Sequence, residues 1–151
     1  MFLDRSKTNM NILVSACLLG VCCTYRGTTK EQKSVLKLLE EGHTLIPVCP
    51  EQLGGLPTPR PASERKGDKV VSCLGVDVTD NFTRGAKEAL RMAKLYHCEV
   101  AVLKERSPSC GNGQIYDGSF QGILIEGDGV TAELLKQHGI RVLGESEIEY
   151  I

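Results

Sequence analysis

The sequence lacks any marked excess of charge. Its 18 Lys and Arg residues nearly balance its 19 Asp and Glu residues, which leaves a formal net charge of -1 at pH 7. Proteins that bind nucleic acid or anionic membranes through their overall field carry a clear positive excess. The charge therefore gives no indication of RNA binding, and any RNA contact would have to be local.

Long hydrophobic runs are also absent. The longest, ILVSACLLGVCC at 12–23, is shorter than the roughly 20 residues that span a bilayer. Arg5 and Lys7 precede it, as in a signal peptide, but no A-x-A cleavage pattern follows, and cleavage there would remove a strong strand candidate. We therefore expect no membrane segment and interpret the run as a strand that continues into a loop.

Regularly spaced cysteines are the third absence. The chain has seven cysteines, an odd number without the spacing of a secreted disulfide framework. We therefore expect a cytoplasmic protein whose cysteines are free thiols, metal ligands or redox groups. Its 151 residues, 41% hydrophobic and 25% charged, fit one globular domain.

The sequence does contain an alternation of strand-like and helix-like segments. Short apolar strands are predicted at 12–16, 44–48, 99–103 and 140–143. Helices are predicted from a capping box at 29–32 to Gly42, from Thr79 or Asp80 to near His97, and over 130–139. The residues expected on the inner faces of the first two helices are Val35, Leu38, Leu39, Phe82, Ala86, Ala89, Leu90 and Ala93.

This alternation predicts a single α/β domain over 11–151, with three layers, a mainly parallel, Rossmann-like sheet and a small hairpin extension. The Pro- and Gly-rich segment 49–68 is predicted to be a long loop, and 69–79 an edge strand or hairpin. Asp117-Gly118 is a candidate hairpin turn. Residues 1–10 are expected to form an N-terminal extension.

Three cysteines follow three of the predicted strands. Cys17, Cys49 and Cys110 occupy these positions although 32 and 61 residues separate them. Loops that leave the carboxyl ends of parallel strands form the binding crevice of such sheets, so we expect these thiols to meet at one edge as a ligand set. Cys73 and Cys98 are expected to be small core residues instead.

The histidines are predicted to lie elsewhere. His43, His97 and His138 fall at or just past predicted helix C-termini, where a cationic side chain suits the last carbonyls, so a Cys-His pair or Cys/His zinc site is not expected. Four cysteines close a zinc site, whereas three on a [4Fe-4S] cluster leave one iron open. Cys22 or Cys23 could supply a fourth ligand.

Polar residues near these cysteines suit an active site. Glu51 follows Cys49 by two residues and could act as a general acid or base, or be a helix-start carboxylate. Ser107 and Ser109 could hydrogen-bond a ligand or satisfy their turn. Arg60, between two prolines, could meet an anion or be an exposed loop residue.

A set of longer motifs extends this picture: SACLLG at 15–20, CTYRG at 23–27, PVCPEQLGGLPTPRP at 47–61, GVDVT at 75–79, LKERSPSCG at 103–111, IYDGSF at 115–120 and GDGVTAELL at 127–135. Together they resemble the bacterial domain-of-unknown-function 523 family over residues 11 to about 148. Characterised members are thiouracil desulfurases. The resemblance implies a non-redox, [4Fe-4S]-dependent enzyme that converts thiouracil or 4-thiouridine-type compounds to uracil or uridine and sulfide.

The same resemblance assigns residue roles. Cys17, Cys49 and Cys110 would hold the cluster, and Glu51 and Ser107 would transfer protons. Ser109, Arg26 and Arg60 are candidate substrate contacts, and the expected partner is a small thiolated base or nucleotide. Two positions depart from the family pattern, because Cys22 replaces a usual polar residue and Tyr25-Arg26-Gly27 replaces Tyr-Asp-Gly. Arg26 would change the charge at the pocket mouth and so bear on substrate preference.

Two other classes of function stay open at this point. Cys17, Cys23, Cys49 and Cys110 could close a zinc site in a binding module. Alternatively, the adjacent Cys22 and Cys23 could carry out thiol redox or persulfide transfer without a metal.

Overall fold

The computed structural model describes residues 9–151. Its central sheet has four parallel strands in the order β2-β1-β5-β8. These strands are β1 (Asn11–Ser15), β2 (Thr44–Val48), β5 (Val100–Leu103) and β8 (Arg141–Gly144). The predicted parallel α/β sheet is therefore confirmed, and the second predicted strand matches the observed one residue for residue.

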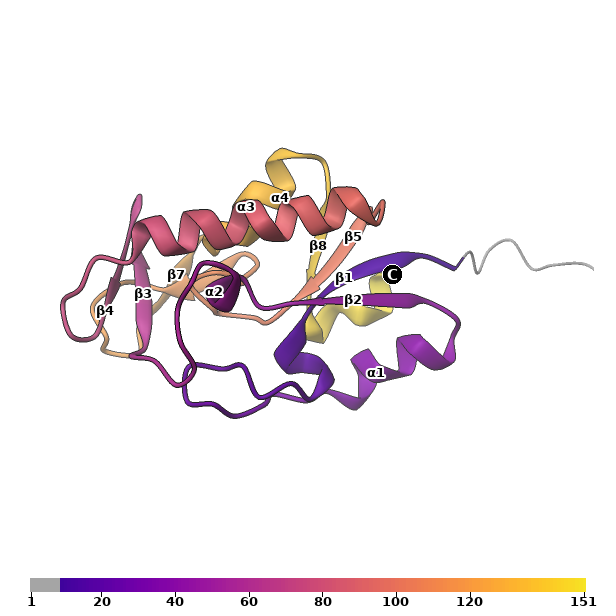
Figure 1. Cartoon of the computed structure of the whole chain (residues 1–151), viewed down its shortest axis with the longest axis horizontal. Helices are drawn as coiled ribbons and strands as arrows, with labels where there is room; N and C mark the ends of the chain where they lie inside the picture. Colours follow the sequence, from indigo (N-terminus) through magenta and orange to yellow (C-terminus); the bar gives the residue numbers. More distant parts are fainter. Residues whose placement is uncertain (1–8) are drawn as a thin grey trace, which may run out of the picture.

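Helices cover both faces of the sheet (Figure 1). Helices α3 (Thr79–Leu95) and α4 (Val130–Gln137) pack together on one face, and α1 (Lys33–Glu40) lies on the other, with the 3-10 helix η3 (Glu145–Tyr150) beside it. Strand β1 is buried on both faces, because Leu13 joins the core under α3 and α4 whereas Ile12 and Val14 join the core under α1. This burial explains why the sequence of β1 is apolar without alternation.

Smaller elements lie beyond the carboxyl ends of the strands, at the left in Figure 1. They are the short helix α2 (Pro50–Leu53), the antiparallel hairpin of β3 (Ser63–Lys66) with β4 (Lys69–Ser72), and the antiparallel hairpin of β6 (Gln114–Tyr116) with β7 (Leu124–Glu126). The interpretation of 49–68 as a loop was therefore wrong, since α2 and β3 lie within it.

The second hairpin exists, but its turn is longer than predicted. Residues 117–123 connect β6 to β7, and the backbone N–H of Asp117 donates to the Ile123 carbonyl across this loop at 3.0 Å. Asp117 and Gly118 therefore begin a longer loop instead of forming the two-residue turn that their sequence favours.

The capping residues predicted for two helices were wrong, although α3 does begin at Thr79. Thr29 does not cap α1, because its hydroxyl donates to the Cys17 carbonyl at 2.9 Å and the helix starts at Lys33. Thr79 lies inside α3, where Asp77 Oδ1 accepts the Thr79 N–H at 2.9 Å.

The predicted inner faces of the helices are largely correct. Leu39, which was expected on the inner face of α1, is 50% exposed. The predicted inner face of α3 is confirmed, since all five of its named residues are buried.

Helix α2 is held in place by close backbone contact with α3. A Cβ added at Gly85 of α3 would collide with the Pro50 carbonyl, so only glycine permits this approach. The Asn81 side chain donates to the Gly54 carbonyl at 2.8 Å from the same face of α3. These contacts position the first turn of α2, which carries Glu51.

The expected N-terminal extension lies mostly outside the described residues, because residues 1–8 are not described. Met10, however, is integrated with the domain: its carbonyl accepts the Thr44 N–H at 2.9 Å and its own N–H donates to His43 Nδ1 at 3.1 Å. Over residues 9–151, none of the helices has the length and apolar character needed to cross a membrane.

Candidate active site

The carboxyl ends of β1, β2 and β5 border a cavity of about 440 Å³. Cys17, Cys49 and Cys110 all line this cavity, together with a fourth cysteine, Cys23. The expectation that the first three thiols meet at one edge of the sheet is therefore correct in its geometry. All are free thiols.

Each of the three cysteines is positioned by backbone hydrogen bonds near a strand end. Cys17 lies in the 3-10 helix η2 (Ala16–Leu19) directly after β1, and its carbonyl accepts the Lys30 N–H at 3.0 Å. Cys49 directly follows β2 and is the N-cap residue of α2. The first two positions are thus fixed by the elements that adjoin them.

Cys110 lies farther from its strand, in a loop that the start of α4 holds. The N–H of Val130 donates to the Pro108 carbonyl at 2.9 Å, and the N–H of Thr131 donates to the Ser109 carbonyl at 2.8 Å. Because the first N–H groups of a helix have no partner within it, α4 satisfies them on the Cys110 loop and fixes that loop.

Three of the thiols that line the cavity have raised pKa values. Burial raises the pKa of Cys110 to about 12, although hydrogen bonds with Ser15 and Ser109 act in the opposite direction. A hydrogen bond with Cys17 raises the pKa of Cys23 to about 11. The pKa of Cys49 is raised by its hydrogen bond with Cys23 and by burial. A metal that binds these thiols must therefore displace their protons.

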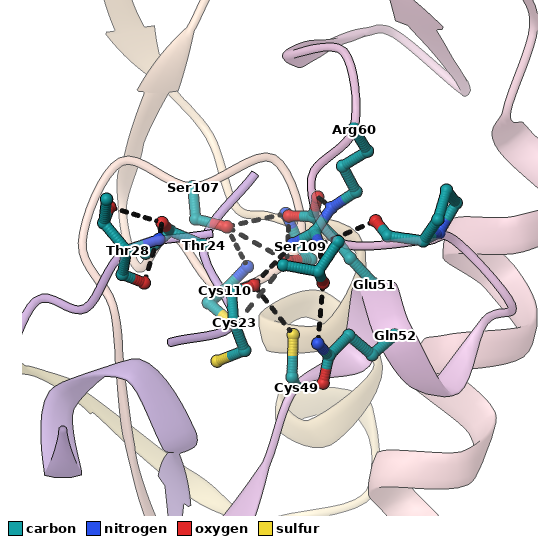
Figure 2. A network of polar contacts seen from close by, with 12 residues as sticks. Cys23, Thr24, Thr28, Cys49, Glu51, Gln52, Arg60, Ser107, Ser109 and Cys110 are labelled. Carbon is teal, nitrogen blue, oxygen red and sulfur yellow. Dashed lines mark hydrogen bonds and ion pairs between the residues drawn. The ribbon is translucent and has the colours of Figure 1, made fainter. Parts of the chain in front are cut away.

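Glu51 faces the Cys110 loop across the cavity. Its Oε1 accepts a hydrogen bond from Arg60 Nε at 3.0 Å, and its Oε2 accepts one from the Ser109 hydroxyl at 3.2 Å. Ser109 Oγ in turn lies 3.0 Å from Ser107 Oγ. Figure 2 shows this continuous chain of contacts from Arg60 through Glu51 and Ser109 to Ser107.

The Ser107 hydroxyl is oriented by its neighbours. Its oxygen accepts the backbone N–H of Ser109 at 3.1 Å and that of Cys110 at 3.0 Å. Because these two donors occupy its acceptor positions, the Ser107 proton is directed toward Ser109 or into the cavity. Ser107 therefore satisfies its turn, which is one of the two roles considered for these serines. Ser107 and Ser109 also both line the cavity.

Arg60 lines the cavity, but its guanidinium is turned toward protein groups. Its side chain is only 4% exposed, so the alternative of an exposed loop residue is wrong. Besides Glu51, the guanidinium donates to Thr58 Oγ1 at 2.9 Å, to the Pro57 carbonyl at 3.2 Å and to the Cys23 carbonyl at 2.8 Å. Protein acceptors therefore use four of its five N–H donors.

Arg26 lies beside the cavity and is not one of the residues that line it. Its Nε donates to the Tyr25 hydroxyl at 3.1 Å, and its guanidinium carbon lies 5.4 Å from the Tyr25 ring centroid. The predicted effect of Arg26 at the pocket mouth would therefore act through Tyr25, which does line the cavity.

Several lining residues gave no signal in the sequence. The basic residues Lys30, Lys104 and Arg106 line the cavity together with the acidic Glu64 and Glu105, and Tyr116 is a second lining aromatic residue in addition to Tyr25. These residues lie in loops or short strands without a recognisable spacing. Ser15 was also missed, although its hydroxyl accepts the Lys104 N–H at 2.9 Å at the end of β1.

The remaining cysteines and histidines lie away from the cavity wall. Cys98 is buried in the core as predicted, but Cys73 is exposed in the turn after β4, so its assignment to the core was wrong. Cys22 is exposed and does not line the cavity, which weakens a joint redox role with the buried Cys23. None of the three histidines lines it either.

A closed zinc site receives no geometric support. Over the described part of the chain, no group of three or more His, Cys, Asp or Glu side chains is arranged to hold a metal ion. A single zinc ion requires four ligands that converge on one point at about 2.0–2.3 Å. The three strand-end thiols and Cys23 line one cavity.

Comparison with known proteins agrees with this geometry. The 2-thiouracil desulfurase family matches residues 12–147. The chain is 43% identical over 150 residues to the uncharacterized protein YbbK of Bacillus subtilis (strain 168), covering 93% of this chain and 99% of YbbK. A solved structure of the [4Fe-4S]-dependent thiouracil desulfidase TudS superimposes with a TM-score of 0.88 and is 45% identical, covering 94% of this chain and 95% of that one. The family match spans nearly the whole domain, and the chain is therefore a member of the 2-thiouracil desulfurase family.

Proposed function

We propose that this protein is a [4Fe-4S]-dependent desulfurase that replaces the sulfur of a thiolated uracil with oxygen. The observation that carries the proposal is the cavity itself, where thiols from three strand ends face the Glu51–Ser109–Ser107 chain of contacts. The 45% identity to a [4Fe-4S]-dependent thiouracil desulfidase supports the same activity.

The donor set fits an iron–sulfur cluster. Cys17, Cys49 and Cys110 provide soft thiolate ligands, which iron–sulfur clusters use, and the cavity of about 440 Å³ lies between them. Three ligands would leave one iron open to the sulfur of a substrate. Cys23 lies beside the set and hydrogen-bonds with Cys17 and Cys49; we assign it to the wall of the site and not to the ligands.

The proposed reaction needs no electrons. A thiocarbonyl and water give a carbonyl and hydrogen sulfide, so that one C=S bond is replaced by C=O and both water protons leave on sulfur. When bound, the cluster supplies a thiophilic Lewis acid that polarises the C=S group. The protein's own part is to orient the base, to take a proton from the attacking water and to deliver protons to the departing sulfur.

Glu51 and Ser107 are the proposed proton-transfer residues. Glu51 Oε2 is the carboxylate oxygen that Arg60 does not bind, and it is connected to Ser107 through Ser109. Two backbone N–H groups on Ser107 Oγ would stabilise negative charge on that oxygen when its proton is given up. A proton can thus move between water, carboxylate and serine inside one cavity.

The proposed substrate is a small thiolated base or its nucleotide. The cavity volume lies within the range of small-molecule sites, and Tyr25 and Tyr116 offer aromatic surface for a planar pyrimidine ring. The Ser109 hydroxyl contacts Glu51, so we propose Tyr25, Tyr116 and Ser107 for direct contact with substrate ahead of Ser109, Arg26 and Arg60.

The test is an anaerobic assay of protein reconstituted with iron and sulfide. We expect four irons per chain and equal amounts of uracil and sulfide released from 2-thiouracil or 4-thiouracil. Serine substitution of Cys17, Cys49 or Cys110 should each abolish cluster retention, whereas Cys23→Ser and the exposed control Cys73→Ser should retain iron. A fully loaded protein that converts no thiolated uracil, base or nucleotide, would refute the activity.

A further inference from the structure

Arg60 and Glu51 form the most enclosed ion pair in the described part of the chain, with side chains 4% and 15% exposed. Arg60 lies on the proline-rich segment between α2 and β3, while Glu51 lies in the first turn of α2. A pair so shielded from water keeps its geometry better than a surface pair, because fewer solvent contacts compete with it.

Arg60 also joins the first loop to its own segment. Its side chain binds the Cys23 carbonyl of the first loop and Thr58 on its own segment, while its backbone N–H donates to the Tyr25 carbonyl at 2.8 Å. A guanidinium is planar and presents its donors at fixed angles. These contacts therefore fix the plane of the guanidinium, and with it the Glu51 oxygen that Arg60 binds.

The contact with Arg60 also determines where the other Glu51 oxygen points. With Oε1 bound to Arg60, Glu51 Oε2 is the oxygen that faces Ser109, whose side chain is fully enclosed at 2% exposure. Ser109 then lies within hydrogen-bond distance of Ser107. Tilting the carboxylate out of its present plane would break both contacts of Glu51 at once.

We infer that Arg60 is a positioning residue that holds Glu51 in the orientation required for proton transfer, instead of a residue that binds substrate. The inference rests on the proposed desulfurase activity for its kinetic readout. A positioning residue acts on the chemical step, so its loss lowers kcat with little change in KM, whereas loss of a substrate contact raises KM.

The experiment compares Arg60→Lys with Arg65→Lys in the reconstituted holoenzyme. Arg65 is a matched control, because it also pairs with a carboxylate, Glu133, at 2.7 Å and donates to two backbone carbonyls, yet does not line the cavity. We expect Arg60→Lys to lower kcat roughly 10- to 100-fold, with KM within about threefold and iron content unchanged. Arg65→Lys should leave kcat as in the unmodified enzyme.

A double-mutant cycle then tests whether Arg60 acts through Glu51. In a Glu51→Gln background, Arg60→Lys should lower kcat by less than about threefold, because the carboxylate that it positions is already gone. Equal effects of Arg60→Lys in both backgrounds, a selective rise in KM, or loss of iron would each overturn the inference. Should Arg60→Lys fail to fold, Thr58→Val removes one guanidinium partner and should give the same kinetic pattern more weakly.

Failure of the proposed function gives a different result. If the unmodified, cluster-loaded protein shows no turnover, the desulfurase activity is wrong, and the same cycle is then read in thermal unfolding of that protein. A coupling between Arg60→Lys and Glu51→Gln would support the positioning contact. Additive effects of the two substitutions would refute it.

Discussion

At the scale of single residues, Thr131 is an exception to the satisfied polar interior. It is fully buried in α4, and its hydroxyl oxygen is the buried side-chain polar atom that has no hydrogen-bond partner among residues 9–151. An enclosed hydroxyl without a partner keeps the cost of its lost hydration, which is about 1–3 kcal/mol.

Thr131→Val should therefore raise the free energy of unfolding by about 1 kcal/mol, because it removes the hydroxyl and keeps the shape. Thr131→Ser is the matched control: it keeps the hydroxyl, removes one buried methyl and should lower the free energy of unfolding by about 1 kcal/mol. Urea unfolding of both variants measures the difference. A loss of stability in Thr131→Val would mean that the hydroxyl has a partner such as a bound water.

The sequence allowed a site residue to be placed where the sheet topology determines its position. Cys17 and Cys49 lie within two residues of the ends of parallel strands, so their common edge could be inferred before any coordinates. The direction in which a side chain points could not be inferred from the sequence. Arg60 between two prolines reads as an anion-binding residue, but only the fold shows that its guanidinium turns inward to Glu51 and the Cys23 carbonyl.

At the scale of elements, α4 supports the loop that carries Cys110. Gly129 lies immediately before this helix, and a Cβ at this position would collide with the Ser109 carbonyl group and lie 2.7 Å from the Cys110 nitrogen. Its backbone angles, φ -64 and ψ 159, are open to any residue. The requirement for glycine here is therefore one of space and not of conformation.

Gly129→Ala should lower the free energy of unfolding by about 1–3 kcal/mol through overpacking and should reduce iron retention, since the Cys110 loop must shift. Gly113→Ala, in the same loop, is the converse control, because its φ is 79 but its Cβ would meet open space; it should cost about 1–2 kcal/mol without iron loss. Thermal unfolding and iron content should be measured for both variants. Equal iron content in the two variants would contradict a role of Gly129 in holding the Cys110 loop.

Long elements could be predicted from the sequence better than short ones. The 17-residue helix α3 shows enough turns for its buried face to be named from the sequence. Helix α2 and strand β3 have only 4 residues each, in a segment rich in Pro and Gly. Such short elements do not show the hydrophobic period of a helix or of a strand. Their positions depend on tertiary contacts such as the approach of Gly85 to Pro50.

At the scale of the whole molecule, the buried thiols couple stability to pH. Cys23, Cys49 and Cys110 have raised pKa values in the folded, metal-free chain, whereas an unfolded cysteine ionises near pH 8.5. Above that pH the unfolded chain binds fewer protons than the folded chain. The three thiols therefore contribute their full share to the free energy of unfolding below about pH 8.5. That contribution is lost progressively as pH rises toward the pKa values of the folded chain.

Urea unfolding of the metal-free, reduced protein should show this loss between about pH 8.5 and 10. The expected slope is about -1.4 kcal/mol per pH unit for each thiol that keeps its proton. Cys110→Ala should lower the overall stability but make the slope shallower. A stability that is flat across this range would show that these thiols ionise in the folded state as they do in the unfolded one.

The clamp of α4 on the Cys110 loop also sets an order of events during biosynthesis. Cys17 and Cys49 emerge from the ribosome early, but the loop of Cys110 is held by backbone groups of residues 129–131, close to the last strand. A nascent chain that stops short of α4 can present two of the thiols but cannot hold the third in place. If the chain holds the proposed cluster on these three thiols, the complete ligand set would form only after α4 has been translated.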